Sequence, residues 1–430
     1  MLLKGPRGSG KSALLREASI RLQRGEVPNA NAIGFYVSLR HLPLLTSRER
    51  EYEEHFYRLL MHEISVVANV DLDVMPDTAH VQSALTDLSA TLGKRLVLLF
   101  DDAAHIGREA PRTEFFDLFR TLSGSRVSCK ASIYPGVTNF GTRFDVYNDA
   151  SVIDLARNEE HGGYGEFFAE ILEKRYGDAL ATERFVSTFA KEDAAGFVGR
   201  AVLGNVRAYV SLWNRLLSLC ERDPQFRIGL NQVGDTLVEQ SQEYFWPLID
   251  EVRPKLGKYE PMVGSAMRLG EVLYDEAAEH DVRSVLVLRE MVERLAKPFE
   301  ILEYAGFIAR REASRGMKSS GRGTRFVLNL CNLLERMRPP RLTSQLYQKW
   351  TERDRDPLEL HRGAKELQEI RVPDLPETGE LSVLDLPIES LVARPSSFVS
   401  PCQARATACR SSPGVNGGCD ALHLGRNGPA

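Results

Sequence analysis

The sequence predicts an α/β protein: a parallel sheet with helices on both faces, followed by a helical lid and a C-terminal winged helix domain. Three observations lead to this prediction. A glycine-rich loop joins a short apolar strand to a helix near the start of the chain, at Gly5–Ser12. Apolar strands then alternate with amphipathic helices, the order that produces a parallel sheet. Farther on, two helices precede a basic, glycine-rich hairpin, which is the order of a winged helix-turn-helix.

The loop fits the pattern G-x-x-x-x-G-K-[ST] of a phosphate-binding P-loop, so the core is expected to be that of a P-loop NTPase. It consists of Gly5, Pro6, Arg7, Gly8, Ser9, Gly10, Lys11 and Ser12. Lys11 is expected to reach the β- and γ-phosphates, and the Ser12 hydroxyl to ligate Mg²⁺. The helix that begins here directs its positive end at the anion. A chance match in a glycine-containing loop is the alternative, and the strand before and helix behind the loop weigh against it.

The rest of the predicted core, residues 1–158, continues the alternation. Apolar residues at helical spacing indicate the helices, and short apolar runs indicate the strands. We expect helices over Ser12–Leu22, Phe56–Val67, Val81–Leu92 behind an Asp77 cap, and Pro111–Leu122, and strands over Ala32–Leu39, Arg95–Asp102, Val127–Tyr134 and Ser151–Leu155. Only four residues precede the loop, fewer than the roughly five or six of a usual strand. We therefore expect the native chain to begin farther upstream.

The apolar strand Leu96–Phe100 runs into two acids, Asp101 and Asp102. Sheets of this kind place ligands at the carboxyl ends of their strands. We therefore interpret the pair as a Walker B element, in which Asp101 holds Mg²⁺ through water and Asp102 orients the attacking water. A strand that simply ends in an acidic turn is the alternative. The position after a P-loop, in an alternating strand and helix pattern, favours Walker B.

Polar groups on the fourth strand and in the lid complete the expected site. Thr138 and Asn139 are candidates to contact the γ-phosphate, although a plain turn explains them almost as well. Residues 159–239 are helical in pattern and form the predicted lid. Within the lid, Gly204-Asn205-Val206-Arg207 opens a helix, from which Arg207 is expected to reach bound phosphate. An exposed arginine at a helix start is the alternative.

Residues 240–341 form the predicted winged helix domain. We expect helices over Val285–Leu295 and Pro298–Tyr304, and hairpin strands over Phe307–Arg310 and Thr324–Leu330. The basic residues of the hairpin are Arg310, Arg311, Arg315, Lys318, Arg322 and Arg325, against one acid, Glu312. Such a tip suits the phosphate backbone of double-stranded DNA, whose contacts fix position without reading sequence. A solvated loop on a winged helix that contacts protein is the alternative.

The end of the chain and its overall composition set limits on the function. Residues 342–430 are expected to be a linker and a disordered tail, with one more helix conceivable at Leu358–Ile370, because Pro, Gly and Ser accumulate and periodicity is lost. A net charge of −4 over 430 residues means that any basic patch must be local. No apolar run approaches the ~20 residues of a membrane span. Six cysteines without metal-like pairing fit a reducing cytoplasm.

Taken in order, these motifs resemble those of AAA+ ATPases of the origin-recognition/replication-initiator type. The motifs are the P-loop, Asp101-Asp102, the polar fourth strand, the lid segment at Arg207 and the winged helix. The segment Lys130–Asn139 looks like that of a bacterial branch of the group, and the resemblance covers roughly residues 1–335. It implies ATP and Mg²⁺ bound between core and lid, ATP hydrolysis, Arg207 as the second sensor, and double-stranded DNA bound through the lid and winged helix.

Two departures from the family pattern keep alternatives open. Many AAA+ enzymes have Asp-Glu at Walker B, so the shorter Asp102 implies slower hydrolysis. Asp-Asp is also frequent in STAND signalling ATPases, and a signalling switch whose winged helix contacts protein is the second hypothesis. A P-loop kinase fits less well, because no second substrate-binding motif is found. An arginine finger supplied by a neighbour in a homo-oligomer is not identified, and its candidates are Arg108, Arg112, Arg120 and Arg143.

Overall fold

The structure is a computed structural model. It describes residues 1–40, 43–44, 47–103, 109–135, 140, 143–318, 321–354 and 356–374; of residues 109–113, 147, 255 and 258 only the backbone is described. All of these lie in the first of the chain's two compact units, residues 1–386. Among the described residues, no helix is long and apolar enough to cross a membrane.

Five strands form a parallel sheet in the order β2-β3-β4-β1-β5. They are β1 (Leu2–Lys4), β2 (Ala32–Ser38), β3 (Arg95–Asp101), β4 (Val127–Ile133) and β5 (Val152–Asp154). The predicted strands are therefore present, each within a few residues of its expected bounds. Because β1 lies between β4 and β5 and β3 lies next to β4, the P-loop and the Walker B acids leave the sheet at the same edge.

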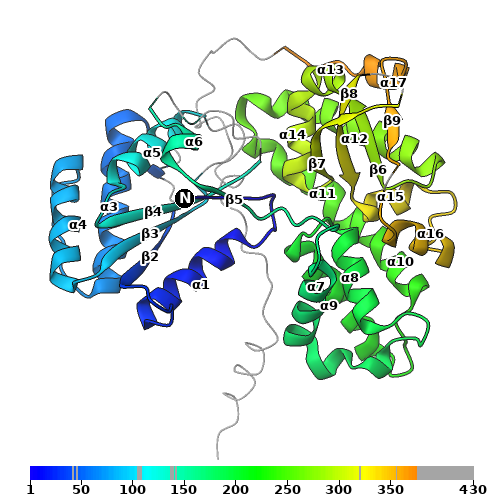
Figure 1. Ribbon diagram of the computed structural model, residues 1–430, viewed down its shortest axis with the longest axis horizontal. Helices are drawn as coiled ribbons and strands as arrows, with labels where there is room; N and C mark the ends of the chain where they lie inside the picture. The colour runs from blue at the N-terminus through cyan, green and yellow to red at the C-terminus, as the bar shows by residue number, and fades with distance from the viewer. Residues whose placement is uncertain are drawn as a thin grey trace, which may run out of the picture. The chain divides into compact units, whose positions relative to one another are not determined.

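Helices cover both faces of this sheet (Figure 1). The helices are α1 (Lys11–Arg24), α3 (Glu49–Ala68), α4 (Thr78–Leu92), α5 (Glu109–Leu122) and the short α6 (Val146–Asp149). Along β3, Leu98 and Phe100 pack with α3 and α5, whereas Val97 and Leu99 point to the opposite face and pack with Leu15 of α1. This alternation is the period-two pattern of a strand buried on both faces. The predicted α/β core is confirmed.

The lid and the winged helix share one hydrophobic core. The lid helices are α7 (Tyr164–Tyr176), α8 (Lys191–Ala201), α9 (Val206–Arg222) and α10 (Leu230–Gln240), with 3₁₀ turns at Gly177–Leu180 and Thr182–Arg184. A π-turn, η3 (Ser241–Phe245), carries α10 directly into α11 (Trp246–Val252). The predicted division at residue 239 therefore falls inside a continuous helical segment, and the lid has no separate core of its own.

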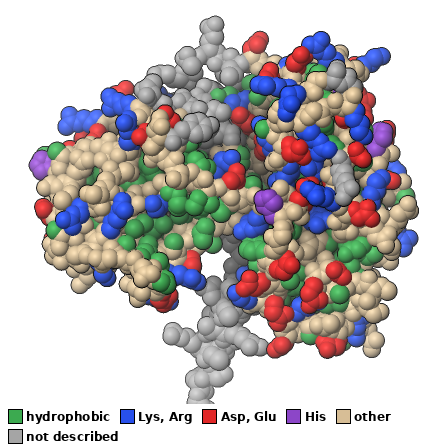
Figure 2. All heavy atoms as spheres, in the orientation of Figure 1, with side chains coloured by type: hydrophobic (Ala, Val, Ile, Leu, Met, Phe, Trp, Pro, Cys, Tyr) green, Lys and Arg blue, Asp and Glu red, His purple; other side chains and the backbone are tan. Residues whose placement is uncertain are grey.

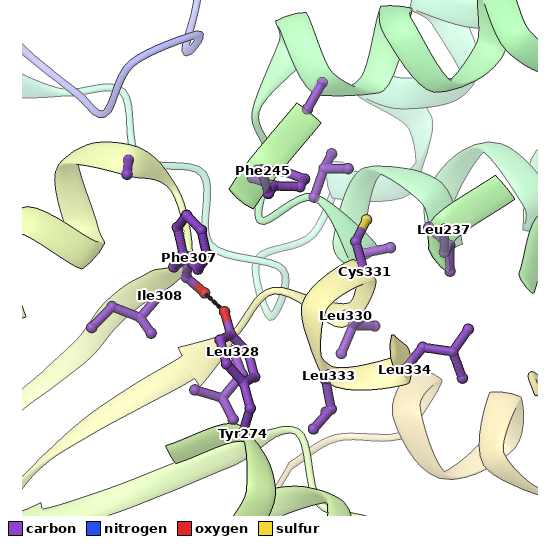
Figure 3. Packing of buried hydrophobic residues seen from close by; sticks show 14 of the residues in the cluster. Leu237, Phe245, Tyr274, Phe307, Ile308, Leu328, Leu330, Cys331, Leu333 and Leu334 are labelled. Carbon is purple, nitrogen blue, oxygen red and sulfur yellow. Dashed lines mark hydrogen bonds between the residues drawn. The ribbon is translucent and has the colours of Figure 1, made fainter. Parts of the chain in front are cut away.

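Figure 3 shows this shared core from close by. Leu237 of α10 and Phe245 of η3 belong to the same cluster as Tyr274 of α12 (Val263–Glu279) and Phe307. The Tyr274 hydroxyl donates a hydrogen bond of 2.6 Å to the Phe307 carbonyl. Such a bond keeps the phenol satisfied within an apolar interior.

The winged helix has the element order helix, strand, helix, helix, hairpin. After 3₁₀ turns at Arg253–Lys255 and Gly257–Met262 and helix α12, the elements are β6 (Ser284–Leu288), α13 (Arg289–Arg294), α14 (Ala296–Ala305), β7 (Ile308–Gly316), β8 (Arg322–Leu328) and α15 (Leu330–Arg336). β8 pairs antiparallel with both β7 and β6. α14 ends at Gly306, which takes the left-handed φ of +82°.

The predicted helix over Val285–Leu295 is wrong in its first half. Residues 284–288 are strand β6, and only Arg289–Arg294 is helical. The run Val285-Leu286-Val287-Leu288 is rich in β-branched residues, and it pairs with Phe326 and its neighbours on β8. This pairing brings together residues about 40 positions apart, so the local sequence pattern does not reveal it.

Part of the predicted linker after residue 341 is folded. It contains α16 (Ser344–Thr351), β9 (Leu358–Leu360) and α17 (Lys365–Glu369). β9 pairs parallel with β6, and the side chains of Trp350, Leu367 and Ile370 are buried. The helix considered over Leu358–Ile370 is thus a strand followed by a short helix. The predicted tail beyond residue 374 lies outside the described residues.

Candidate nucleotide-binding site

The P-loop folds around the ammonium group of Lys11. Gly8 and Gly10 take left-handed φ angles of +83° and +94°, which a residue with a side chain rarely adopts. Gly10 is the N-cap residue of α1, so the helix begins directly at Lys11. The Lys11 side chain is buried, and its Nζ donates to the carbonyl oxygens of Gly5 at 2.7 Å and Pro6 at 2.9 Å.

Burial lowers the pKa of Lys11 to about 7, because the charged ammonium loses water. Asp102 and Asp101 oppose this shift, while the positive charges of Arg207 and Arg40 add to it. Both predicted Walker B acids and the lid arginine are therefore close enough to the predicted Walker A lysine to influence its charge.

Two features of the loop fit a bound phosphate. The Ser9 hydroxyl is buried and has no hydrogen-bond partner within the described part of the chain, and a buried polar atom is normally satisfied. The positive end of α1 is at Lys11 and Ser12, and Ser12 is exposed. An anion at this end would meet the helix amides, the helix dipole and the Lys11 ammonium together.

Asp101 is held at the end of β3 by two hydroxyl donors. Tyr36 on β2 donates to Asp101 Oδ2 at 2.8 Å, and Ser132 on β4 donates to Oδ1 at 2.7 Å. Both donors come from the strands that flank β3. The carboxylate is thus aimed by the sheet itself, as a group that holds a metal-bound water requires.

Asp102 leaves the strand in the left-handed conformation, with φ of +57°. Its amide donates to the Ser132 hydroxyl at 2.9 Å, and its Oδ1 accepts from the Tyr134 hydroxyl at 2.9 Å. Its Oδ2 forms an ion pair with Arg40, although the carboxylate is only 2% exposed. Burial lowers the pKa of Arg40, but the attraction of Asp102 outweighs burial and raises it above its ordinary value.

The first turn of α9 rests on the P-loop. The backbone amide of Arg207 donates to the Gly8 carbonyl at 3.2 Å. Asn205 caps α9 through the Ala208 amide and donates from Nδ2 to the Arg7 carbonyl at 3.0 Å. A Cβ on Gly8 would lie 2.1 Å from Asn205 Oδ1, so only glycine allows this approach. The Arg207 side chain itself is exposed.

The winged helix also touches the loop. The Arg7 amide donates to the carbonyl of Tyr304, in the last turn of α14, at 3.4 Å. The Arg7 guanidinium pairs with Glu251 of α11 at 3.0 Å. The ring of Tyr304 packs edge-on against that of Tyr134, with centroids 5.0 Å apart. Three segments from outside the sheet, α9, α11 and α14, therefore meet the loop.

The structure separates the six predicted DNA-contacting residues into two groups. Arg311 and Arg325 are buried: Arg311 pairs with Glu159 at 2.7 Å, and Arg325 with Glu160 at 2.8 Å. These two guanidinium groups are used inside the protein, which corrects their predicted place on the surface. The four that reach solvent at least in part are Arg310, Arg315, Lys318 and Arg322.

Several predicted residues cannot be placed. Thr138, Asn139 and Arg108 lie outside the described residues, and only the backbone of Arg112 is described. Of the remaining candidates for an arginine finger, Arg120 forms an ion pair with Asp149 at 3.5 Å, and Arg143 is exposed. Tyr134, Tyr36 and Arg40 were missed as site residues. Their position in the carboxyl-terminal half of a predicted strand or just after it was the available signal.

No protein-family model and no curated protein sequence matches this chain. Among solved structures, it is similar to the Orc1 protein of Aeropyrum pernix in complex with DNA, with 15% identity over 81% of this chain and 85% of that one and a TM-score of 0.38. Drosophila ORC bound to DNA matches with 10% identity over 78% and 88% of the two chains, at a TM-score of 0.32. Caenorhabditis elegans (C. elegans) PCH-2 matches with 14% identity over 56% of this chain and 61% of that one, at a TM-score of 0.30. Because these identities are low, we assign the fold from the strand order of this chain itself.

Proposed function

We propose that this chain is an ATP-binding and ATP-hydrolysing protein of the AAA+ type, similar to a bacterial branch of the origin-recognition ATPases and acting in the cytoplasm. Its nucleotide state would control how the lid and the winged helix rest on the core. The observation that carries the proposal is that the P-loop with Lys11 and the two Walker B acids leave the sheet at the same edge, while the first turn of α9, which carries Arg207, contacts the loop. Phosphoryl-transfer sites of this class need these groups for positioning and electrostatic stabilisation.

The residues present suit a nucleotide held between core and lid. The loop Gly5–Ser12 and Lys11 would hold the phosphates, Ser12 and Asp101 would hold Mg²⁺, and Arg207 would act from the lid. Mg²⁺, when bound, neutralises charge on the phosphate oxygens. Asp102 would orient the attacking water, because its carboxylate is fixed by Tyr134 and Arg40.

Two substitutions test the site. Lys11→Ala should abolish nucleotide binding, measured with a fluorescent ATP analogue. Asp102→Asn should leave binding intact and stop turnover, since the amide keeps the shape of the acid without its charge. Circular dichroism spectra matching wild type are the control for folding. ATPase activity unchanged in both variants would rule the site out.

Double-stranded DNA is the proposed partner, and the wing is its proposed contact. Lys318 is 78% exposed, and Arg310, Arg315 and Arg322 flank it on the hairpin. The lid is a poor contact by comparison, because its helices expose many acids; these include Glu166, Glu170, Glu173, Glu221 and Glu239. Figure 2 shows acidic side chains gathered in the lower part of the right-hand body, where Figure 1 draws α7 and α9.

The DNA proposal is tested by replacing Arg315, Lys318 and Arg322 together with Ala. Losing three phosphate contacts should weaken binding and reduce the slope of log affinity against log salt by about three. The matched control replaces Arg175, Arg222 and Arg227 on the lid, which removes the same charge and should leave that slope unchanged. Equal effects of the two triple variants would contradict a wing contact.

One observation favours the second candidate, a signalling ATPase whose winged helix contacts protein. Six of the ten residues of α14 are buried, and besides Ala296 the residues that reach solvent are Lys297, Glu300 and Glu303. Lys297 pairs with Glu300 at 2.6 Å, so this face offers little positive charge to a DNA groove. DNA binding measured with and without ATP across a salt series separates the candidates. Absence of salt-dependent binding in the intact protein favours a protein partner, or a second copy of the chain.

A further inference from the structure

Tyr134 lies at the centre of the candidate site, although neither the P-loop nor the Walker B pattern includes it. It is the first residue after β4, next to the acids at the end of β3. Its side chain is only 6% exposed. A large aromatic residue buried among ionised groups needs partners for both its ring and its hydroxyl.

Each part of Tyr134 contacts a different functional group. The hydroxyl donates to Asp102 Oδ1 at 2.9 Å. The ring face lies 3.9 Å from Lys11 Nζ, within the range of a cation–π interaction. The ring also meets Tyr304 of α14 at 5.0 Å between centroids, with an interplanar angle of 73°. This edge-on geometry is one that aromatic pairs prefer.

We propose that Tyr134 is a positioning residue for ATP hydrolysis, and that Tyr304 makes the winged helix part of the same site by fixing the Tyr134 ring. The proposal rests on the ATPase function proposed above. Tyr134 aims the carboxylate of Asp102 toward the position of the attacking water. Tyr304 holds the ring that carries this hydroxyl, and the hydrogen bond from Arg7 to the Tyr304 carbonyl ties the same turn of α14 to the P-loop.

The protonation state of Tyr134 agrees with this role. Burial and the neighbouring Asp102 raise its pKa well above the ordinary value. The phenol therefore keeps its proton throughout the pH range in which the enzyme works, and it remains a donor to the carboxylate. Rotation of α14 away from the loop would free the Tyr134 ring to move, and Asp102 would then no longer be held in one orientation. Displacement of the winged helix by a partner would then change the rate of hydrolysis.

The test compares Tyr134→Phe, Tyr304→Leu and a matched control, Tyr274→Phe. The control also removes a buried tyrosine hydroxyl that donates one hydrogen bond, but in the core of the winged helix. Tyr134→Phe should lower kcat about ten- to a hundredfold, the equivalent of one hydrogen bond to a charged group, with nucleotide affinity within about twofold.

Tyr304→Leu should lower kcat by about two- to tenfold, the contribution of one aromatic pair. Tyr274→Phe should lower the melting temperature and leave kcat unchanged. Wild-type kcat in Tyr134→Phe overturns the proposal, as does a loss of activity in all three variants in proportion to lost stability. If wild type binds ATP without turnover, the proposed hydrolysis fails instead. The inference then fails with it, because there is no hydrolysis for Tyr134 to position, whereas an active wild type with unchanged kcat in Tyr134→Phe refutes the inference alone.

Discussion

At the scale of single residues, the site depends on groups whose charge is set by burial. Lys11 has the lowered pKa of a buried ammonium, and the charges of two acids and two arginines influence it. Arg40 holds Asp102 from the rim of the sheet. A small change of pH, or the substitution of one charged residue near Lys11, is therefore expected to alter nucleotide affinity more than the stability of the fold.

The first prediction concerns pH. With a pKa of about 7, Lys11 loses its proton as pH rises above 7, so the free protein must take up a proton to present an ammonium to the phosphates. Nucleotide affinity should fall by up to about tenfold per pH unit between pH 7.5 and 9. Calorimetry in buffers of different ionisation enthalpy should detect the uptake. An affinity independent of pH over that range would contradict it.

The same shift affects stability with a defined sign. A lysine whose pKa is lower in the folded than in the unfolded protein destabilises the fold while it stays charged, and this penalty is relieved as pH rises from about 7 toward the ordinary value of 10.5. The free energy of unfolding of Lys11→Met should therefore exceed that of wild type most clearly below pH 7. Denaturant titrations at pH 6 and pH 9 measure the difference.

At the scale of elements, the start of α9 links the lid to the loop through Asn205. Its Oδ1 caps the helix, and its Nδ2 reaches the Arg7 carbonyl. Asn205→Asp keeps the cap but loses this donor and brings a negative charge to a phosphate site, so nucleotide affinity should fall about tenfold. Asn205→Ala should also lower stability by about 1 kcal/mol. Equal affinity in Asn205→Asp and wild type would show that the contact is unimportant for binding.

A second link between elements is a buried ion-pair group. Glu159, in the segment after β5, is 1% exposed and pairs with Arg311 of β7 at 2.7 Å and with Arg283 at 3.3 Å. Burial alone would raise the pKa of Glu159, but the two arginines hold it below its ordinary value. Its stabilising effect is therefore present above the ordinary carboxyl pKa and is lost as pH falls through the lower folded value.

Glu159→Gln should destabilise the protein by about 3–5 kcal/mol, because two buried guanidinium groups lose their counter-charge. The midpoint of urea denaturation measures the effect. Glu166→Gln, an exposed change of the same kind on α7, is the control and should stay within about 0.5 kcal/mol of wild type. A change in Glu159→Gln no larger than in the control would contradict a structural role for the ion pairs.

At the scale of the whole molecule, the lid, the winged helix and residues 342–374 share one core. The last buried residues of the described chain are Leu367 and Ile370. A protein ending at Asp374 should therefore melt near the full-length temperature. A protein ending at Arg341 should be destabilised by several kcal/mol, because it loses Trp350, Leu360 and Leu367 at roughly 1.5–3 kcal/mol each. Thermal melts of both proteins are the measurement, and equal melting temperatures would contradict this prediction.

The sequence by itself determined the parallel α/β core. The features that predicted this core are local in the sequence. They are the glycine-rich motif at Gly5–Ser12, the apolar run that ends in two acids, and the alternation of strands and helices. These signals depend on residues close in the chain, as does the end of α14 at Gly306. The roles of Lys11, Asp101, Asp102 and Arg207 remain predictions, now supported by their proximity.

Only the tertiary structure decided which charges are buried and which strands pair. Arg311 pairs with Glu159 although 152 positions separate them, whereas Lys318, of the same hairpin, reaches solvent. The strand β6 exists because β8 lies beside it, and Tyr134 gains its position from Asp102, Lys11 and α14. The number of charges and the spacing of apolar residues do not predict such contacts. Burial and strand pairing depend on which distant residues the fold brings together.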